Sequence, residues 1–205
     1  MESYITVLHH GEFEYEDRKS VFIGEAMPVS TDEDALAFIN SVKKSYPDAR
    51  HHVYAYVLRD NSIMRFSDDN EPQGTAGMPV LDVIRKNGCV DIAIVVTRYF
   101  GGTLLGTGGL VKAYTSAAVG ALNNAQIITY DIYTEMKIEV SYSDYQKFVP
   151  IFSEVGFRCS DTRYTDMIEI YGSIRKNSFD TLKDKLIQAS AGRVKIEIID
   201  EKFDF

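Results

Sequence analysis

TEMKIEVS, residues 134–141, alternates apolar and polar side chains without interruption. Met136, Ile138 and Val140 fall on one side of an extended chain, and charged residues fall on the other. A strict period of two is typical of a β-strand with one buried face. This segment therefore predicts a half-buried strand, and it fixes how the residues after it are interpreted.

The segments that follow this strand alternate between helical and extended periods. DYQKFVPIFSEVG begins with capping residues and ends at Gly156, which predicts a helix that Pro150 kinks or shortens. The later segments are predicted as strands at 157–164 and 167–174, a helix at 177–191, and a strand at 194–199. The resulting order, β-α-β-β-α-β, is the ferredoxin-like arrangement.

The residues before this region are less regular. Ala35, Phe38, Ile39 and Val42 have the spacing of one helical face, so Asp32–Ser45 is predicted as a helix. The other predicted elements are strands at 53–58 and 89–96 and helices at 80–87 and 110–124. We therefore predict an α+β fold with two domains, 1–130 and 134–205.

The bulk composition excludes several classes of protein. The chain has 205 residues, a net charge of −8 and two cysteines without metal-site spacing. It shows no signal peptide and no apolar run of the ~20 residues that cross a bilayer. A cytoplasmic location is expected. The acidic balance argues against a broadly basic nucleic-acid binder but leaves room for a local basic pocket.

A glycine-rich stretch between a buried strand and a helix is the first candidate site. TRYFGGTLLGTGGLVKAY, residues 97–114, contains five glycines: Gly101, Gly102, Gly106, Gly108 and Gly109. Glycine lets the backbone approach a ligand closely, and the free N–H groups of a helix start favour an anion. Thr97, Arg98 and Lys112 complete the predicted anion-binding site. The alternative is that these glycines serve only a tight crossover, and the known phosphate-loop patterns do not fit.

An acidic stretch, DDNEPQGTAGMP at residues 68–79, is the second candidate. Asp68, Asp69 and Glu71 are residues that could ligate a hard cation or act as bases, but Gly74 and Thr75 beside them favour a shaped turn. No metal, cofactor or catalytic residue is predicted. His51 and His52 are adjacent, so on a strand they would face opposite sides, and only one of them could approach this loop.

These two motifs, with Arg18-Lys19-Ser20, Phe22, His51-His52 and Ala55-Tyr56, resemble the Impact/YigZ family. The resemblance covers about residues 15–125, and the rest is similar to the smaller C-terminal domain of bacterial members. It implies a first domain with the fold of ribosomal protein S5 domain 2, followed by a ferredoxin-like domain. Eukaryotic members are associated with translational control through an additional N-terminal domain, which this sequence does not show. No catalytic residue is established for the family, so the resemblance implies none in this sequence.

Three hypotheses follow from these observations. The favoured one is a non-enzymatic binding protein linked to translation that contacts a ribosome, RNA or a translation factor, with Arg18, Lys19, Arg98 and Lys112 as a basic patch. The alternative is an enzyme that acts on a small phosphorylated or carboxylated substrate within residues 68–114. A third is that the glycines and acids only shape the fold.

Overall fold

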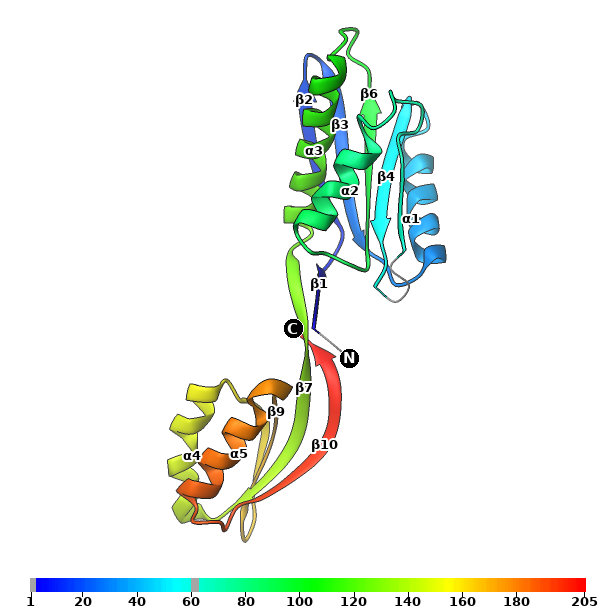
Figure 1. Ribbon diagram of the computed structural model, residues 1–205. Coiled ribbons are helices and arrows are strands. Elements are labelled where there is room, and N and C mark those ends of the chain that lie inside the picture. The colour runs from blue at the N-terminus through cyan, green and yellow to red at the C-terminus, as the bar shows by residue number, and fades with distance from the viewer. Residues whose placement is uncertain (1–2, 60–62) are drawn as a thin grey trace. The chain divides into compact units, whose positions relative to one another are not determined.

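The computed structural model describes residues 3–59 and 63–205, so residues 1, 2 and 60–62 lie outside the description. The chain forms two compact units, one of residues 4–129 and one of residues 130–205 (Figure 1). Both units mix helices with antiparallel sheet, which confirms the predicted α+β class. No helix in the described ranges is long and apolar enough to cross a membrane.

The first unit is a five-stranded antiparallel sheet in the order β2-β3-β6-β4-β5. Its strands are β2 (Gly11–Asp17), β3 (Ser20–Pro28), β4 (His51–Val57), β5 (Met64–Ser67) and β6 (Ile92–Tyr99). A short strand, β1 (Tyr4–Val7), lies beside residues 89 and 90, where the carbonyl of Ile5 accepts from the Val90 N–H at 2.8 Å. The central β6 is buried on both faces, as its continuous apolar run predicts.

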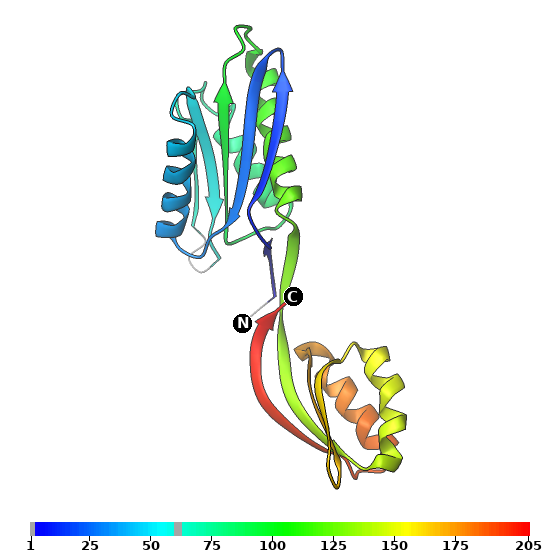
Figure 2. The same ribbon diagram turned by 180° about the vertical axis from the view of Figure 1, so that it is seen from behind.

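Helices cover both faces of this sheet (Figures 1 and 2). Helices α2 (Gly77–Lys86) and α3 (Gly106–Asn124) pack on one face, and α1 (Asp32–Ser45) packs on the other. Helix α1 has the predicted bounds, and a capping box between Thr31 and Asp34 fixes its start. Helix α3 sits very close to the sheet, because a Cβ on Gly24 would lie 2.4 Å from the carbonyl oxygen of Ala117.

Several predicted boundaries in this unit differ from the structure, including the strand predicted at 53–58, which is β4 at His51–Val57. Helix α2 begins at Gly77 rather than residue 80, and α3 begins at Gly106 rather than residue 110. The first turn of each helix contains glycine, whose low helix propensity led the prediction to a later start. In the structure, packing against the sheet overrides that propensity. The central strand begins at Ile92 rather than residue 89, after Asp91 with φ of 54°.

The turn between β2 and β3 consists of Arg18 and Lys19. Asp17 pairs with Ser20, so the connection has two residues, with φ of 47° and 65°. Positive φ at both central positions is the type I′ geometry, which matches the twist of the paired strands. The turn directs two exposed cationic residues to the end of the sheet.

The second unit has the predicted βαββαβ order. Its elements are β7 (Ile127–Val140), α4 (Tyr142–Val155), β8 (Arg158–Tyr164), β9 (Ile168–Arg175), the 3-10 turn η1 (Lys176–Ser178), α5 (Phe179–Ala189) and β10 (Lys195–Asp204). The strands pair antiparallel in the order β10-β7-β9-β8. Met136, Ile138 and Val140 are buried, as their alternation predicts, in one core with residues of α4 and α5. Helix α4 continues through Pro150 and ends at Gly156, which has φ of 74°.

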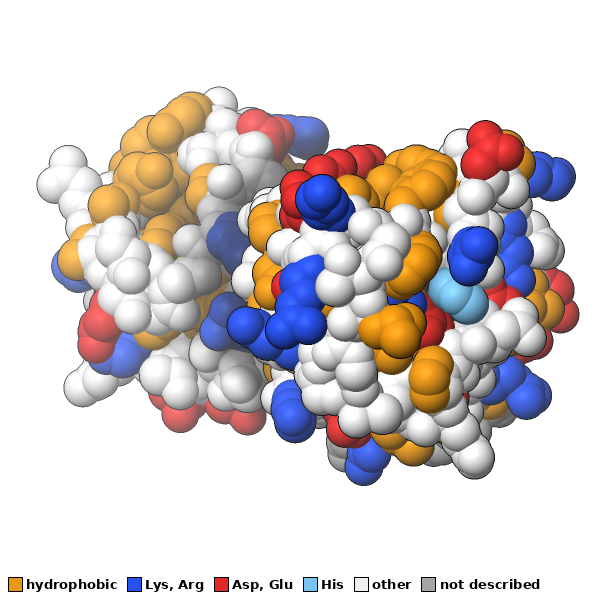
Figure 3. Space-filling view, turned by 90° about the horizontal axis from the view of Figure 1, so that it is seen from above, with side chains coloured by type: hydrophobic (Ala, Val, Ile, Leu, Met, Phe, Trp, Pro, Cys, Tyr) orange, Lys and Arg blue, Asp and Glu red, His pale blue; other side chains and the backbone are white. Residues whose placement is uncertain are grey.

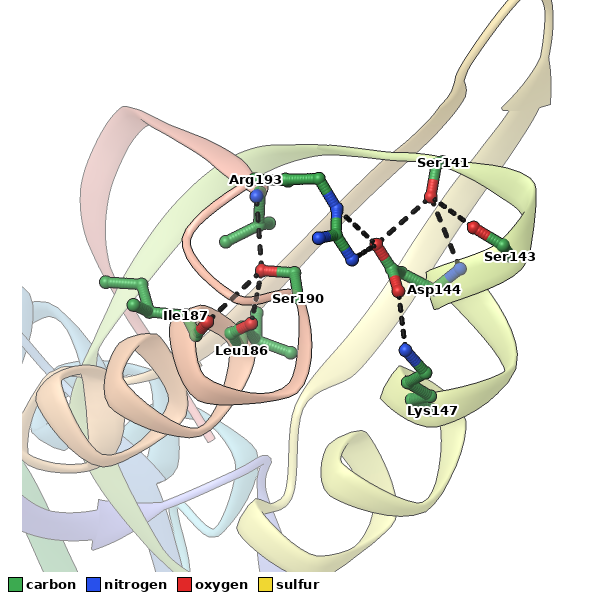
Figure 4. A network of polar contacts seen from close by, with 9 residues as sticks. Ser141, Ser143, Asp144, Lys147, Leu186, Ile187, Ser190 and Arg193 are labelled. Carbon is green, nitrogen blue, oxygen red and sulfur yellow. Dashed lines mark hydrogen bonds and ion pairs between the residues drawn. The ribbon is translucent and has the colours of Figure 1, made fainter.

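A buried carboxylate connects the start of α4 to the loop before β10 (Figure 4). Asp144 accepts from Lys147 Nζ at 2.7 Å and from Arg193 Nη2 at 2.8 Å. Ser141 caps the helix and also donates to this carboxylate at 3.2 Å. The hydrogen bonds from Lys147 and Arg193 lower the pKa of Asp144 to about 2, so the carboxylate is ionised at neutral pH.

Candidate functional site

A buried polar cluster lies where β4, β6, α3 and the 68–77 loop of the first unit meet. Glu71 Oε1 accepts from Arg98 Nη1 at 2.5 Å and from Tyr114 Oη at 2.7 Å. The side chains of Arg98 and Glu71 are only 7% and 4% exposed. Burial, followed by the nearby Glu71 charge, raises the pKa of Tyr114, so this phenol stays protonated and donates. The cluster is a buried ion pair of Arg98 and Glu71, in which the Tyr114 phenol donates a second hydrogen bond to the Glu71 carboxylate.

This pairing bears directly on Arg98 as a predicted anion-binding residue. Its Nη1 is engaged by Glu71, and with a side chain only 7% exposed the guanidinium offers little surface to an anionic ligand. Its flanks are also covered, with Phe22 and Phe100 ring centroids 5.4 and 5.6 Å from the guanidinium carbon. Arg98 Nε and the buried Thr97 Oγ1 make no hydrogen bond within the described residues.

The other carboxylates of the acidic loop are occupied by the main chain. Asp68 accepts from the N–H groups of Gly74, Ala76 and Gly77 at 2.8–3.1 Å, which satisfies the start of α2. Asp69 accepts from the His52 N–H at 2.6 Å. Within the ranges that the structure describes, no group of three or more His, Cys, Asp or Glu residues could hold a metal ion.

The turn chemistry of the same loop explains its remaining polar residues. Thr75 Oγ1 donates to the Pro72 carbonyl at 2.6 Å, and Gly74 has φ of 76°. Asp69 and Asn70 also have positive φ, at 43° and 68°. The loop is thus a built turn whose side chains hold its own backbone.

The two adjacent histidines face opposite sides, as expected for neighbours on a strand. His51 Nδ1 lies 2.7 Å from the Asp69 carbonyl, and its Nε2 lies 3.8 Å from Glu71 Oε1. His52 is buried, with Nε2 3.1 Å from the Tyr46 carbonyl. Only His51 approaches the buried cluster.

The glycine-rich stretch combines close packing with open backbone. A Cβ on Gly101 would lie 2.1 Å from the Lys19 carbonyl carbon, and its N–H donates to Ser20 Oγ at 3.1 Å. Gly102 and Gly106 have φ of 85° and 71°, with nothing within 4 Å of a Cβ placed there. Gly101 therefore serves packing, whereas Gly102 and Gly106 serve a turn that faces open space.

Helix α3 begins in this open backbone without a side-chain cap. Gly108 has nothing within 4 Å of an added Cβ, whereas Gly109 would contact Leu105 at 2.9 Å. Free N–H groups at a helix start attract negative charge. Lys112 is exposed further along α3, and no hydrogen bond or ion pair of the described residues joins it to the loop.

Exposed cationic and apolar side chains surround the glycine-rich loop between β6 and α3. We define the loop-end surface as Arg18, Lys19, Arg50, Phe100 and Leu104. Arg18 Nη1 lies 3.4 Å from the Leu104 carbonyl, and the Arg50 guanidinium carbon lies 5.8 Å from the Phe100 ring centroid. Phe100 is 39% and Leu104 81% exposed. The view onto this end shows Lys and Arg atoms next to hydrophobic ones (Figure 3).

The prediction from sequence did not include Arg50, Phe100 or Leu104 at this site. Phe100 immediately follows β6, and an aromatic residue just before two glycines is a signal that could have indicated exposure. Arg50 lies far away in sequence, and it is the pairing of β4 with β6 that brings it close to the loop. The surface offers cations, an aromatic ring and open backbone. Together these groups suit a negatively charged polymer that carries planar aromatic rings.

Comparison with known proteins adds to this geometry. The Impact N-terminal domain matches residues 18–122, and a domain of unknown function (DUF1949) matches residues 138–193. The chain is similar to IMPACT family member YvyE of Bacillus subtilis (strain 168), with 33% identity over 96% of this chain and 91% of the relative. It is also similar to IMPACT family member YigZ of Escherichia coli (strain K12), with 33% identity over 91% of this chain and 93% of the relative.

A more distant relative and a solved structure agree with these matches. Protein IMPACT of Xenopus laevis is 32% identical over 47% of this chain and 32% of that protein. A crystal structure of a hypothetical protein superposes with a TM-score of 0.61 and 32% identity, covering 98% of this chain and all of the other. The similarity to the solved structure therefore spans nearly the whole chain.

Proposed function

The chain belongs to the IMPACT family, and we propose that it is a non-enzymatic binding protein that contacts RNA, free or in the ribosome, through the loop-end surface. The link to translation comes from the family resemblance. The contact with RNA is supported by the composition of the surface. Of the residues first predicted for this site, Arg18, Lys19 and the open glycines remain in the proposal.

The observation that carries the proposal is the pairing of Arg50 with the exposed ring of Phe100. Aromatic and arginine side chains together form stacking platforms for bases in single-stranded nucleic acid. Arg18 and Lys19 stand beside this pair on the hairpin turn and would contact phosphates. The surface thus offers one group for bases and others for the backbone.

The net charge of −8 is compatible with a contact of this kind. Charges farther away than a Debye length of about 8 Å are largely screened at physiological salt, so the local cations dominate the encounter. The acidic excess of the whole chain lowers non-specific attraction to nucleic acid. The expected binding is therefore modest, local and sensitive to salt.

The non-enzymatic part of the proposal is supported by how the polar side chains are used. Asp68 and Asp69 accept from main-chain N–H groups, and Glu71 accepts from Arg98 and Tyr114. A general base or nucleophile must be within reach of a substrate proton or reacting atom. These side chains instead hold the loop, the helix start and one another.

The test compares two triple variants of the full chain. Arg18→Gln, Lys19→Gln and Arg50→Gln together remove the loop-end cations. Lys44→Gln, Arg85→Gln and Lys86→Gln remove the same charge from exposed positions on α1 and α2. Binding to a fluorescent single-stranded RNA and co-sedimentation with ribosomes are measured over a range of salt concentrations. Each phosphate contact contributes about 0.7 to the salt slope for single strands, so the first variant should lose about 2.

The two variants also define what refutes the proposal. Equal weakening by both triple variants would mean that only net charge matters. No association of the wild-type protein with RNA or ribosomes at low salt would exclude the proposed contact. Circular dichroism of each variant confirms that the fold is retained before binding is compared.

A further inference from the structure

The second unit contains a cavity of its own, and two arginines project toward it. The cavity has a volume of about 500 Å³. Small-molecule sites typically measure about 300–1,000 Å³, so it can hold a ligand of modest size. Its lining includes Tyr133, Phe152, Phe157, Arg158, Arg175 and Ser178. Among the residues that the structure describes, no carboxylate belongs to the lining, although this chain is acidic.

The two arginines are held by Phe205, Asp204 and Asp131, which lie outside the lining, and by Tyr133, which belongs to it. Arg158 Nη1 donates to the Phe205 carbonyl at 3.0 Å, and the Asp204 carboxylate lies 3.4 Å away. Arg175 Nε donates to Tyr133 Oη at 3.3 Å and lies 3.1 Å from Asp131.

Part of each guanidinium is thereby left available. The terminal nitrogens of Arg175 and the Nη2 of Arg158 make no hydrogen bond within the described residues. The side chains of Arg158 and Arg175 are 46% and 58% exposed. The arginines are thus oriented by their anchors while still offering free donors, which suits an oxyanion such as phosphate.

Aromatic rings form another part of the wall. The Phe152 and Phe157 ring centroids are 4.6 Å apart at an interplanar angle of 32°. Tyr133 lies under the Arg158 guanidinium, 4.4 Å from its carbon. Tyr133, Phe152 and Phe157 are 2%, 9% and 8% exposed, so they present only a narrow apolar strip to the cavity. A strip of this kind can contact one edge of a planar ring of a ligand.

Hydrogen-bond acceptors complete the lining. Helix α4 ends here, and its last turn leaves carbonyl groups without helical partners. Ser153 and Ser178 also line the cavity, and their hydroxyl hydrogens are engaged with Val149 and Asn177, so their oxygens accept. Acceptors of this kind suit hydroxyl groups of a ligand, and they would repel a second anionic group.

The three kinds of wall define one class of ligand. We propose that this cavity binds a nucleoside monophosphate, with its phosphate on Arg158 and Arg175, its sugar hydroxyls on the acceptors at the end of α4, and its base against the aromatic side chains. The same chemistry occurs in a free nucleotide and at the 5′-phosphorylated end of an RNA. The site belongs to the second unit and is independent of the loop-end surface.

The experiment titrates the full chain with adenosine 5′-monophosphate, adenosine, inorganic phosphate and a short RNA with a 5′-phosphate. Heats of binding and backbone NMR shifts are recorded. The monophosphate should bind at least about tenfold more tightly than adenosine or phosphate alone, since each half uses a separate wall. The shifts should concentrate at residues 153–158 and 175–178. Stronger binding of the RNA than of the monophosphate, with shifts at these same residues, identifies a chain end as the source; the reverse identifies a free nucleotide, and RNA shifts confined to the loop-end surface belong to the other site.

Variants separate a binding site from arginines that only stabilise the end of α4. Arg158→Gln and Arg175→Gln should each weaken monophosphate binding about tenfold, as expected for one charge-assisted contact. Arg175→Lys, which keeps the charge and loses the planar fork, should fall between them and wild type. Arg163→Gln is the matched control, because Arg163 is an exposed arginine of β8 that pairs with Asp161 and does not line the cavity. Absence of saturable monophosphate binding, or equal binding by all variants that remain folded, would overturn the proposal.

Discussion

Replacing Glu71 by alanine tests the buried cluster most directly. The change removes the carboxylate that accepts from Arg98 and Tyr114, and Arg98 is left with its charge in a site where its side chain is only 7% exposed. Removing one partner of a buried pair typically costs about 3–5 kcal/mol, because the remaining charge has no compensation. The unpaired Tyr114 hydroxyl adds to the loss, although the two effects are not additive. We therefore expect a loss near the upper end of that range.

Urea unfolding followed by far-UV circular dichroism measures this loss. The chain has no tryptophan, so intrinsic tryptophan fluorescence cannot report it. The second unit serves as an internal reference, since a change in the first unit should leave its transition in place. Glu71→Gln is the milder control, because its amide oxygen still accepts from Arg98 and Tyr114 while the negative charge is absent.

A double variant identifies the origin of the loss. Glu71→Ala combined with Arg98→Met removes both charges, so it should be at least as stable as Glu71→Ala alone if the unpaired cation is the main penalty. A loss below about 1 kcal/mol for Glu71→Ala would refute the reasoning, because that magnitude is typical of solvent-exposed pairs. Glu71 and Arg98 would then be available to a ligand, and the enzyme hypothesis would regain support.

Three further predictions concern single residues. Gly101→Ala should cost about 1–3 kcal/mol through its clash with the Lys19 backbone, whereas Gly108→Ala, in open space on α3, should gain up to about 1 kcal/mol; equal effects in urea unfolding would contradict the distinction. Ellman's reagent should modify the exposed Cys159 quickly at neutral pH and leave Cys89 unmodified until unfolding, since burial raises the pKa of Cys89 to about 11; two fast thiols would show that Cys89 is accessible. The stability that Asp144 contributes is present above its ordinary pKa of 3.8 and is lost as pH falls through 3.8 toward about 2, so acid titration of thermal unfolding should bring wild type and Asp144→Asn closer together; a constant gap would refute it.

Local signals explain the elements that the sequence predicts well. Helix α1 combines a capping box with an apolar face that repeats along its whole length, so its bounds and its buried side are both specified within its own residues. Strand β7 has a strict alternation over residues 134–140 that matches its burial. Where capping and periodicity agree, the prediction needs no information from distant parts of the chain.

The site could be predicted only in part, because its pairs are distant in sequence. Arg98 is separated from Glu71 by 27 positions, and only the folded sheet shows that they neutralise each other. A cation next to a glycine-rich loop is compatible with ligand binding and with burial, and sequence alone does not distinguish the two. Arg50 and Phe100 meet for the same kind of reason, across paired strands.

The hairpin turn of Arg18 and Lys19 shows a trade-off between stability and binding. Both residues occupy left-handed backbone, which costs a side-chain-bearing residue roughly 1–2 kcal/mol, and Asn-Gly is the pair best suited to this turn. A protein engineer seeking higher thermal stability would choose that pair first, and the engineered protein would lose two exposed cations. Optimisation of this chain for stability alone would therefore erode the contact proposed for it, and a screen that measured only melting temperature would score the loss as an improvement.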